Sequence, residues 1–318
     1  SGNPLGLLIE EARTNVLTRS NELLTAPWNG DAEIVASSIP SIAGGQCFKI
    51  SSNGGAADYW IQSGVASNGQ RKSIWARTVS GTGTAHILGH NSVSATLVTL
   101  TEEWQRFSLN VGAGEAGGTH IYAVDFRGSG TLSEILVFGA QLETGAFPTS
   151  YIPTSGSTVT RAADIASLPV ERFAYNQAQG SVVVSVSEYS AVSSPNAAIL
   201  TLGEDVLSGN WQLLYVTSTK NTVVFNSRGY SATQANLTNT ANNLNVPFKS
   251  GASWARNNYN LTVNGNTVVV DTVGTGLAAV TKLVLGNFAS NPAFLNGHIK
   301  SIQYYPKRLS NTELQLLT

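Results

Sequence analysis

Short runs of β-branched and aromatic residues alternate with polar, glycine-rich turns along the whole chain. Such residues favour extended strands because their bulky side chains pack well on a pleated surface. Many short strands with few helical patterns between them predict an all-β fold, either a sandwich or a barrel. The runs that we expect to form strands are 72–79, 105–111, 121–126, 135–138, 182–186, 211–216, 222–225, 261–263 and 267–270.

Two short motifs make more specific predictions. Asn264-Gly265 lies between two apolar runs, and this dipeptide favours the left-handed backbone of a tight hairpin turn. Near the C-terminus, Ser310 and Glu313 have the S-x-x-E spacing of a capping box, in which each side chain bonds to the other residue's backbone N–H. The sequence therefore predicts one short C-terminal helix over 311–317.

The length of the chain predicts two domains. The chain has 318 residues, whereas a single hydrophobic core usually stops growing at about 250–300 residues. The small, polar stretch 153–157 is the best candidate for a boundary. We therefore expect two tandem β-sandwich (jelly-roll) domains, one over 1–155 and one over 156–318, with the first strand of the second domain near 161–164.

Composition changes this picture mainly through charge. Charged residues make up 12% of the chain, against ~25% in typical domains. The balance of 18 Lys and Arg to 19 Asp and Glu gives a net charge of −1, which argues against a nucleic-acid-binding protein. No apolar run is long enough for membrane insertion, and the single cysteine, Cys47, excludes an internal disulfide. The chain also lacks methionine, so we expect a fragment or processed product of a longer protein.

A recurring set of motifs covers the N-terminal half. They are 6–15, Trp28, 75–77, 103–107, 139–143 and 147–154. This set resembles the carbohydrate-binding-module-like jelly roll of bacteriophage tail fibres, head fibres and related spikes. The resemblance implies that residues 1–155 form such a module.

A second resemblance covers the end of the chain. The stretch 295–306, followed by 308–310 and by Glu313-Leu314, is similar to the last strand and closing helix of concanavalin A-like, laminin-G-like sandwiches in the same proteins. Similar head spikes are carried by gene transfer agents. The two resemblances together imply a lectin-like adhesin on the surface of a virion or phage-like particle. Its partners would be host capsular or cell-surface polysaccharide and, through an upstream region, other particle proteins.

Carbohydrate binding has a recognisable side-chain chemistry. Aromatic rings stack on the C–H faces of sugars, and planar polar groups such as amides and guanidinium bond to the hydroxyls. Strand alternation places Trp75 and Arg77 on one face of their strand. The same argument pairs Trp60 with Gln62 and Trp104 with Arg106. The residues that we expect to bind carbohydrate are Trp60, Gln62, Trp75, Arg77, Trp104, Arg106, Trp254, Arg256 and Tyr259.

The same residues admit a structural interpretation. The tryptophans could seal the sandwich cores while the arginines solvate the rims. A purely structural fibre segment is then a further hypothesis, in which low surface charge leaves sheet edges open to pairing and favours a homo-oligomer. Whether the rings lie open to solvent decides between these interpretations.

An enzyme is the main alternative to an adhesin. Glycoside hydrolysis requires two suitably spaced carboxylates, but no Glu-x-Asp-x-x-Glu strand occurs here, and Glu102 and Glu103 are adjacent and face opposite sides. Asp125 and Arg127 share a face and are better explained as an ion pair. We predict no catalytic residues, with a polysaccharide depolymerase or lyase built from cross-strand carboxylates as the alternative.

Metal and cofactor signals are weak. His86 and His90 are four positions apart, which in an extended strand is about 13 Å, too far for one metal ion. His120 and His298 are isolated in the sequence. We therefore expect no cofactor, with a structural calcium ion at a loop carboxylate as the alternative.

Overall fold

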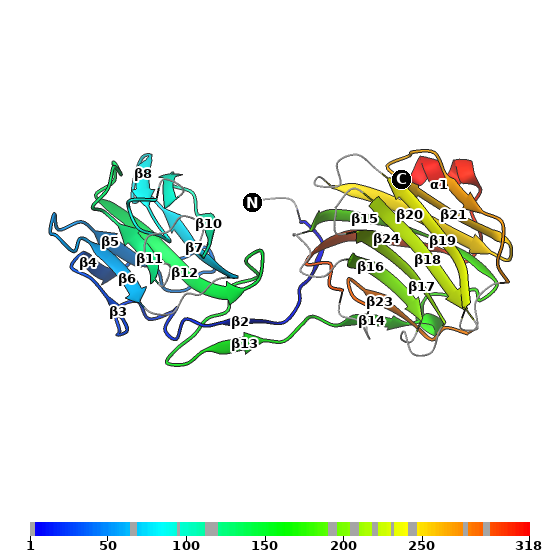
Figure 1. Ribbon diagram of the computed structural model, residues 1–318, viewed down its shortest axis with the longest axis horizontal. Coiled ribbons are helices and arrows are strands. Elements are labelled where there is room, and N and C mark those ends of the chain that lie inside the picture. The colour runs from blue at the N-terminus through cyan, green and yellow to red at the C-terminus, as the bar shows by residue number, and fades with distance from the viewer. Residues whose placement is uncertain are drawn as a thin grey trace. The chain divides into compact units, whose positions relative to one another are not determined.

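A computed structural model of the chain describes residues 4–63, 69–93, 96–111, 120–189, 196–203, 210–217, 222–229, 232–240, 247–275, 279–288 and 293–318. The regular structure in these ranges is nearly all β-strand, with a short C-terminal helix, which confirms the predicted fold class (Figure 1). The chain divides into two compact units. The N-terminal unit is Ala12–Ala162, and the C-terminal unit is Ala163–Thr318 together with the segment that ends at Glu11.

The N-terminal unit is a sandwich of two antiparallel sheets. Its strands are β2 (Arg13–Asn15), β3 (Trp28–Asn29), β4 (Glu33–Ala36), β5 (Phe48–Ser51), β6 (Tyr59–Ser63), β7 (Gln70–Arg77), β8 (Gly83–His86), β9 (Leu97–Leu100), β10 (Gln105–Asn110), β11 (His120–Asp125), β12 (Glu134–Thr144) and β13 (Val159–Arg161). Sheet 1 has the strand order β10-β7-β12-β5-β4, and sheet 2 has the order β3-β6-β11-β8-β9. Strands β2 and β13 form a separate two-stranded ladder.

Strand alternation decides which side chains of sheet 1 enter the core. On β7, Ile74 and Ala76 are fully buried in the cluster between the two sheets. Trp75 and Arg77 alternate with them and are only partly buried. Sheet 1 therefore has an inner, apolar face and an outer face that carries Trp75 and Arg77.

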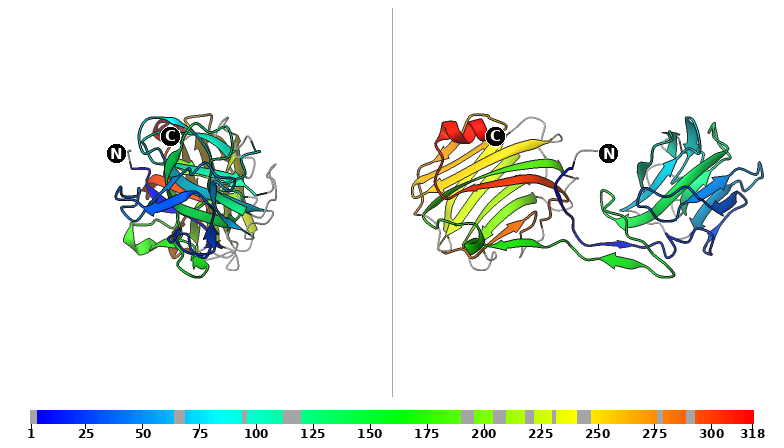
Figure 2. Two further views of the ribbon diagram at one scale, coloured as in Figure 1. Left: turned by 90° about the vertical axis from the view of Figure 1, so that its left-hand side faces the viewer. Right: turned by 180° about the vertical axis from the view of Figure 1, so that it is seen from behind.

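The C-terminal unit is also a sandwich. Its elements are β1 (Leu7–Ile9), β14 (Ala166–Pro169), β15 (Gln179–Tyr189), β16 (Asn196–Gly203), β17 (Trp211–Thr217), β18 (Thr222–Gly229), β19 (Ala232–Thr240), β20 (Phe248–Ala255), β21 (Asn258–Val263), β22 (Val269–Asp271), β23 (Lys282–Leu285), β24 (Gly297–Tyr305) and α1 (Asn311–Leu317). Sheet 3 has the order β1-β24-β15-β20-β21-β22, and sheet 4 has the order β14-β23-β16-β17-β18-β19. Helix α1 packs on β20 and β21 (Figure 2).

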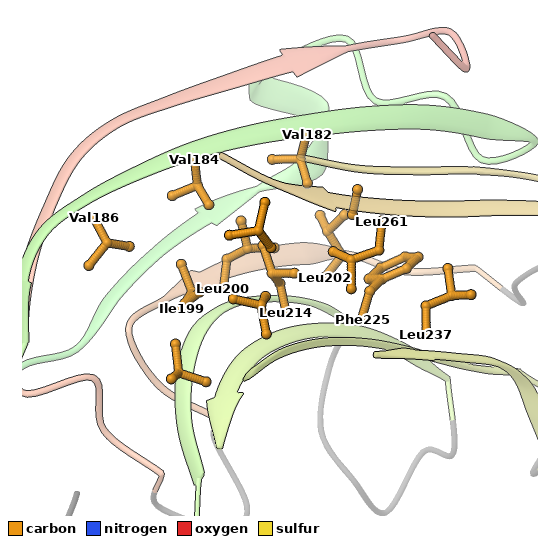
Figure 3. Packing of buried hydrophobic residues seen from close by; sticks show 14 of the residues in the cluster. Val182, Val184, Val186, Ile199, Leu200, Leu202, Leu214, Phe225, Leu237 and Leu261 are labelled. Atoms are coloured by element: carbon orange, nitrogen blue, oxygen red, sulfur yellow. The ribbon is translucent and has the colours of Figure 1, made fainter. Parts of the chain in front are cut away.

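The core of the C-terminal unit lies between sheets 3 and 4. Figure 3 shows Val182 and Val184 of β15 facing Leu214 and Phe225 from the other sheet. All four side chains are at most 3% exposed. Because alternate residues of each strand point inward, the β-branched run that predicted β15 also supplies this core.

The unit boundaries differ from the expected division at 155 and 156. The N-terminal strand β1 pairs with β24 in the C-terminal unit. Gly6, just before β1, has φ +115°, and a Cβ there would lie 2.3 Å from the carbonyl oxygen of Ile299. At the other boundary, β13 pairs with β2, so residues 159–161 belong to the N-terminal unit. Long-range strand pairing, which the local sequence does not encode, causes both differences.

The two local motifs form as predicted. Asn264 and Gly265 have φ values of 49° and 69°, and the Asn266 N–H closes the turn on the carbonyl of Val263 at 2.9 Å. The β21–β22 ladder resumes only at Val269, so the tight hairpin is followed by a short unpaired stretch. Helix α1 begins after Ser310, and both bonds of the capping box are present. No helix in the described part of the chain is long and apolar enough to cross a membrane.

Candidate functional site

The outer face of sheet 1 carries a small apolar cluster of its own. Leu136 and Phe138 of β12 are buried in it, together with Cys47. The half-buried side chains that pack on them are Ile39, Trp75, Val79, Trp104 and Tyr151. We call the surface formed by Trp75, Arg77, Trp104 and Arg106 the Trp75 face.

Strand register brings the parts of the Trp75 face together. Trp75 pairs with Phe138 of β12 on one side and with Arg106 of β10 on the other. Trp104 directly precedes β10, whose first residue, Gln105, pairs with Ala76. The Trp75 face therefore comes from two adjacent strands and from the residue that precedes one of them. Of the nine expected carbohydrate-binding residues, the four of the Trp75 face are the ones that share a partly exposed surface.

Arg106 is held firmly at the centre of this face. Its Nη1 donates to the carbonyl of Thr149 at 2.6 Å, and its Nη2 donates to Ser73 Oγ at 3.0 Å. Its Cζ lies 6.0 Å from the centroid of the Trp75 ring, within the range of a cation–π interaction. The guanidinium is thus fixed beside the indole by the surrounding protein.

The segment 147–154, which we call the strap, borders the Trp75 face. Glu143 of β12 accepts from both the backbone N–H and the hydroxyl of Thr149. Tyr151 packs edge-on against Phe138, with 5.0 Å between ring centroids. Burial raises the pKa of Tyr151 to about 12, so its hydroxyl stays protonated and donates to Asn21 Oδ1 at 3.0 Å.

Two further arginines lie on the outer face of β7. Arg71 donates to Ser108 Oγ at 2.7 Å and also to Asn110 Oδ1. Burial lowers the pKa of Arg71, but a guanidinium remains charged in proteins. The Nε of Arg77 donates to the carbonyl of Thr78 at 3.0 Å. Both cations are therefore oriented by neutral groups.

A hydroxyl-rich pocket lies at one end of this surface. Its volume is about 190 Å³, and its lining includes Val79, Ser80 and Glu134. Val79 also packs in the apolar cluster of the outer face. Glu134 forms an ion pair with Lys49 at 3.2 Å. The pocket therefore adds hydroxyl groups and one ion-paired carboxylate beside the apolar cluster of the outer face.

Trp60 and Gln62 do not join this surface. They share the inner face of β6, so alternation directs them into the sandwich. The Trp60 ring packs against the core, and its Nε1 donates to the carbonyl of Leu23 at 2.9 Å. Gln62 is fully buried. The expectation of a sugar-stacking ring with an adjacent amide is corrected here, because both groups face inward.

Trp254 and Tyr259 are also core residues. They are 2% and 1% exposed, and they pair across the β20–β21 hairpin. The stretch that suggests a polar-aromatic loop in the sequence is a tight hairpin, with Arg256 exposed at its turn. Both rings lie on the inner face of sheet 3, so neither can stack on a ligand at the surface.

Sequence reasoning missed a cluster on the outer face of sheet 2. The rings of His90 and His120 lie edge-on to Tyr122, with centroids at 5.9 and 6.2 Å. Close by, Arg127 bonds to the Asp125 carboxylate at 2.8 Å, which confirms the predicted ion pair. Burial raises the pKa of Asp125, but hydrogen bonds from Arg127 and the Asn91 N–H outweigh it and hold the pKa below its ordinary value. His120 and Tyr122 are two positions apart on β11, so strand alternation alone could have shown that their rings share a face.

Metal-binding groups are sparse. No group of three His, Cys, Asp or Glu residues suited to a metal ion occurs in the ranges that the structure describes. The most enclosed loop carboxylate, Asp58, accepts hydrogen bonds from Ser52 Oγ, Asn53 N and Gly54 N. Its oxygens are thus occupied by protein donors. The adjacent carboxylates at 204–205 lie outside the described residues.

Comparison with known proteins gives only distant similarity. No protein-family model and no curated protein matches the chain. Among solved structures, the CBM40 of the Ruminococcus gnavus IT-sialidase, bound to α2,3-sialyllactose, is 20% identical and covers 45% of this chain and 84% of its own, with a TM-score of 0.39. The NanB sialidase of Streptococcus pneumoniae is 14% identical and covers 48% of this chain and 26% of its own, with a TM-score of 0.39. Sheep galectin-11, in complex with glycerol, is 14% identical and covers 45% of this chain and 98% of its own, with a TM-score of 0.32.

Proposed function

We propose that this protein is a non-enzymatic, lectin-like adhesin that binds host capsular or cell-surface polysaccharide through the Trp75 face. The observation that carries the proposal is the grouping of two partly exposed indoles, Trp75 and Trp104, with the guanidinium groups of Arg77 and Arg106 on adjacent strands. The remaining expected site residues, apart from exposed Arg256, are buried or packed on a core.

The chemistry of the Trp75 face suits a sugar better than an apolar ligand. An indole face offers a flat surface for the C–H groups of a pyranose. Guanidinium groups fixed in position donate to hydroxyls at a low cost in side-chain entropy. The bonds from Arg106 to Thr149 and Ser73 supply this fixation. A shallow face of this kind favours contact with one or two sugar units of a long chain.

We place the adhesin on the surface of a virion or of a phage-like particle such as a gene transfer agent. The motifs 139–143 and 147–154, which resemble phage fibre and spike proteins, support this placement. A small sugar site binds weakly by itself, but many copies on one particle raise the overall avidity.

A polysaccharide-binding assay tests the proposal. The full chain is applied to an array of bacterial capsular polysaccharides, together with the variants Trp75→Ala and Trp104→Ala. We expect each variant to lose most of the binding, while circular dichroism shows the β-sheet signal of the original chain. Leu316→Ala, which changes an 82% exposed side chain of α1, serves as the control and should bind normally.

Two results would overturn the proposal. Binding by both tryptophan variants at the original level would remove the Trp75 face as the site. A decrease in the chain length of the bound polysaccharide, measured by size-exclusion chromatography after incubation, would show an enzyme instead of an adhesin.

A further inference from the structure

We propose that the Trp75 face selects acidic polysaccharide, in which sugar units carry a carboxylate. This inference rests on the proposed function, because it names the class of ligand for the same site. The observation behind it is the charge on the outer face of β7, where Arg71 and Arg77 lie on either side of Trp75 along one strand.

Both arginines keep their charge available for a ligand. Within the described part of the chain, the hydrogen bonds of Arg71 go to Ser108 and Asn110, and that of Arg77 goes to Thr78. All these partners are neutral. Neither arginine forms an ion pair with a described carboxylate.

The two carboxylates of β12 near this face have partners within the protein. Glu143 pairs in register with Arg71, but it is fully buried and bonds to Thr149. Glu134, at the end of β12 near the pocket, is paired with Lys49. The two carboxylates of β12 are therefore already engaged, and an incoming carboxylate would meet cations on the outer face of β7.

The spacing along β7 matches a ring with a charged substituent. Residues two apart on a strand are about 6.6 Å apart, so Arg77 lies one such step from Trp75 and Arg71 two steps. A sugar ring stacked on the indole would place a carboxylate within reach of a guanidinium. Arginine binds carboxylates in a two-pronged, charge-assisted geometry that a neutral hydroxyl does not match.

The overall charge of the protein gives no such preference. The net charge is −1, so a polyanion is not attracted to the molecule as a whole. Selectivity for acidic polymers must come from a local group of cations. The Trp75 face supplies two such cations, Arg77 and Arg106, and Arg71 lies further along β7 on the same side of sheet 1.

Three polymers of defined charge test the inference. The immobilised protein is titrated with hyaluronan and polygalacturonate, which carry uronic acids, and with neutral dextran, at low and high salt. We expect both acidic polymers to bind and dextran to bind at least tenfold more weakly, as expected for the loss of one charge-assisted bond. Added salt should weaken the acidic polymers because it screens exposed charges.

Charge-neutralising variants locate the effect. Arg77→Gln and Arg71→Gln should each weaken binding of the acidic polymers by roughly tenfold, and should weaken binding of dextran by less. The control is Arg172→Gln, an exposed arginine in the C-terminal unit, which removes the same charge elsewhere and should have no effect.

The outcomes separate the two proposals. Binding of neutral and acidic polymers with equal affinity, lost in Trp75→Ala but unchanged in the arginine variants, would overturn the acidic preference and leave the proposed function standing. Absence of binding to all three polymers and to the capsular array would overturn both.

Discussion

The guanidinium of Arg106 lies beside the indole of Trp75, with its Cζ 6.0 Å from the ring centroid. The two residues are also register partners on β10 and β7. Arg106 reaches past the ring to Thr149 of the strap. One side chain therefore joins two strands and a loop at the centre of the proposed binding face.

We predict that Arg106→Leu destabilises the N-terminal unit. The substitution removes charge-assisted bonds to Thr149 and Ser73, so the free energy of unfolding should fall by about 1–3 kcal/mol. Urea denaturation followed by tryptophan fluorescence measures this change. Arg77→Leu is the matched control because the side chain of Arg77 donates to its own neighbour, the carbonyl of Thr78. Equal stability of the two variants would contradict the bracing role of Arg106.

We predict that Gly6→Ala weakens the attachment of β1 to the C-terminal unit. A Cβ at Gly6 would lie 2.3 Å from the carbonyl oxygen of Ile299, and φ is +115°. The clash and the left-handed backbone should together lower the free energy of unfolding by about 2–3 kcal/mol. Gly44→Ala separates the two causes, since Gly44 has φ +76° but no atom lies within 4 Å of the position that a Cβ would take. Thermal melts in which both variants lose the same stability would rule out the steric contribution.

We predict an acid-sensitive N-terminal unit because of His86. This ring is 2% exposed, with Nδ1 3.1 Å from Thr96 Oγ1. Burial is the main effect on the pKa of His86 and lowers it. The negative charge of Asp125 raises this pKa and the nearby His90 lowers it further, so the pKa lies below its ordinary value. Histidine in the unfolded chain titrates at about 6.5, so the folded state binds fewer protons just below that pH. Stability should then be constant above about pH 6.5 and decrease as the pH falls further.

Urea denaturation between about pH 7.5 and about pH 5.5 measures this dependence. His86→Gln should flatten the profile, whereas His298→Gln, in the C-terminal unit, should not. Asp125 does not interfere, because its pKa is also lowered and its contribution is lost only below about pH 3.9. An unchanged pH profile in His86→Gln would exclude this histidine as the cause.

We predict that Gln212→Leu stabilises the C-terminal unit. Gln212 is 1% exposed, and neither amide atom has a hydrogen-bond partner. Gln212 lies two residues before Leu214 on β17, so its side chain points to the same face as that of Leu214, which lies in the core. Removal of an unpaired buried amide should raise the free energy of unfolding by about 1–2 kcal/mol. The control is Gln303→Leu at an exposed position of β24, which should leave the free energy of unfolding nearly unchanged. A lower free energy of unfolding in Gln212→Leu would contradict the prediction.

Local patterns were enough to predict much of the fold. The capping box of Ser310 and Glu313 and the Asn264-Gly265 turn depend on neighbours only a few residues away, so the sequence contains all the information they need. Strand alternation likewise placed Trp75 and Arg77 together on the face opposite Ile74. These features have a short physical range, and the structure confirms each of them.

The amino-acid sequence by itself determined the all-β class, the short closing helix and the sharing of faces within each strand. The tertiary structure decided which face of each strand is covered. Alternation puts Trp254 and Ala252 on the same side of β20, just as it pairs Trp75 with Arg77, but only the packing of sheet 4 on sheet 3 buries the first pair. Pairing of β1 with β24 is equally non-local. The alternation of side chains between two faces is a property of each strand by itself, whereas the burial of a face depends on which other element packs against it.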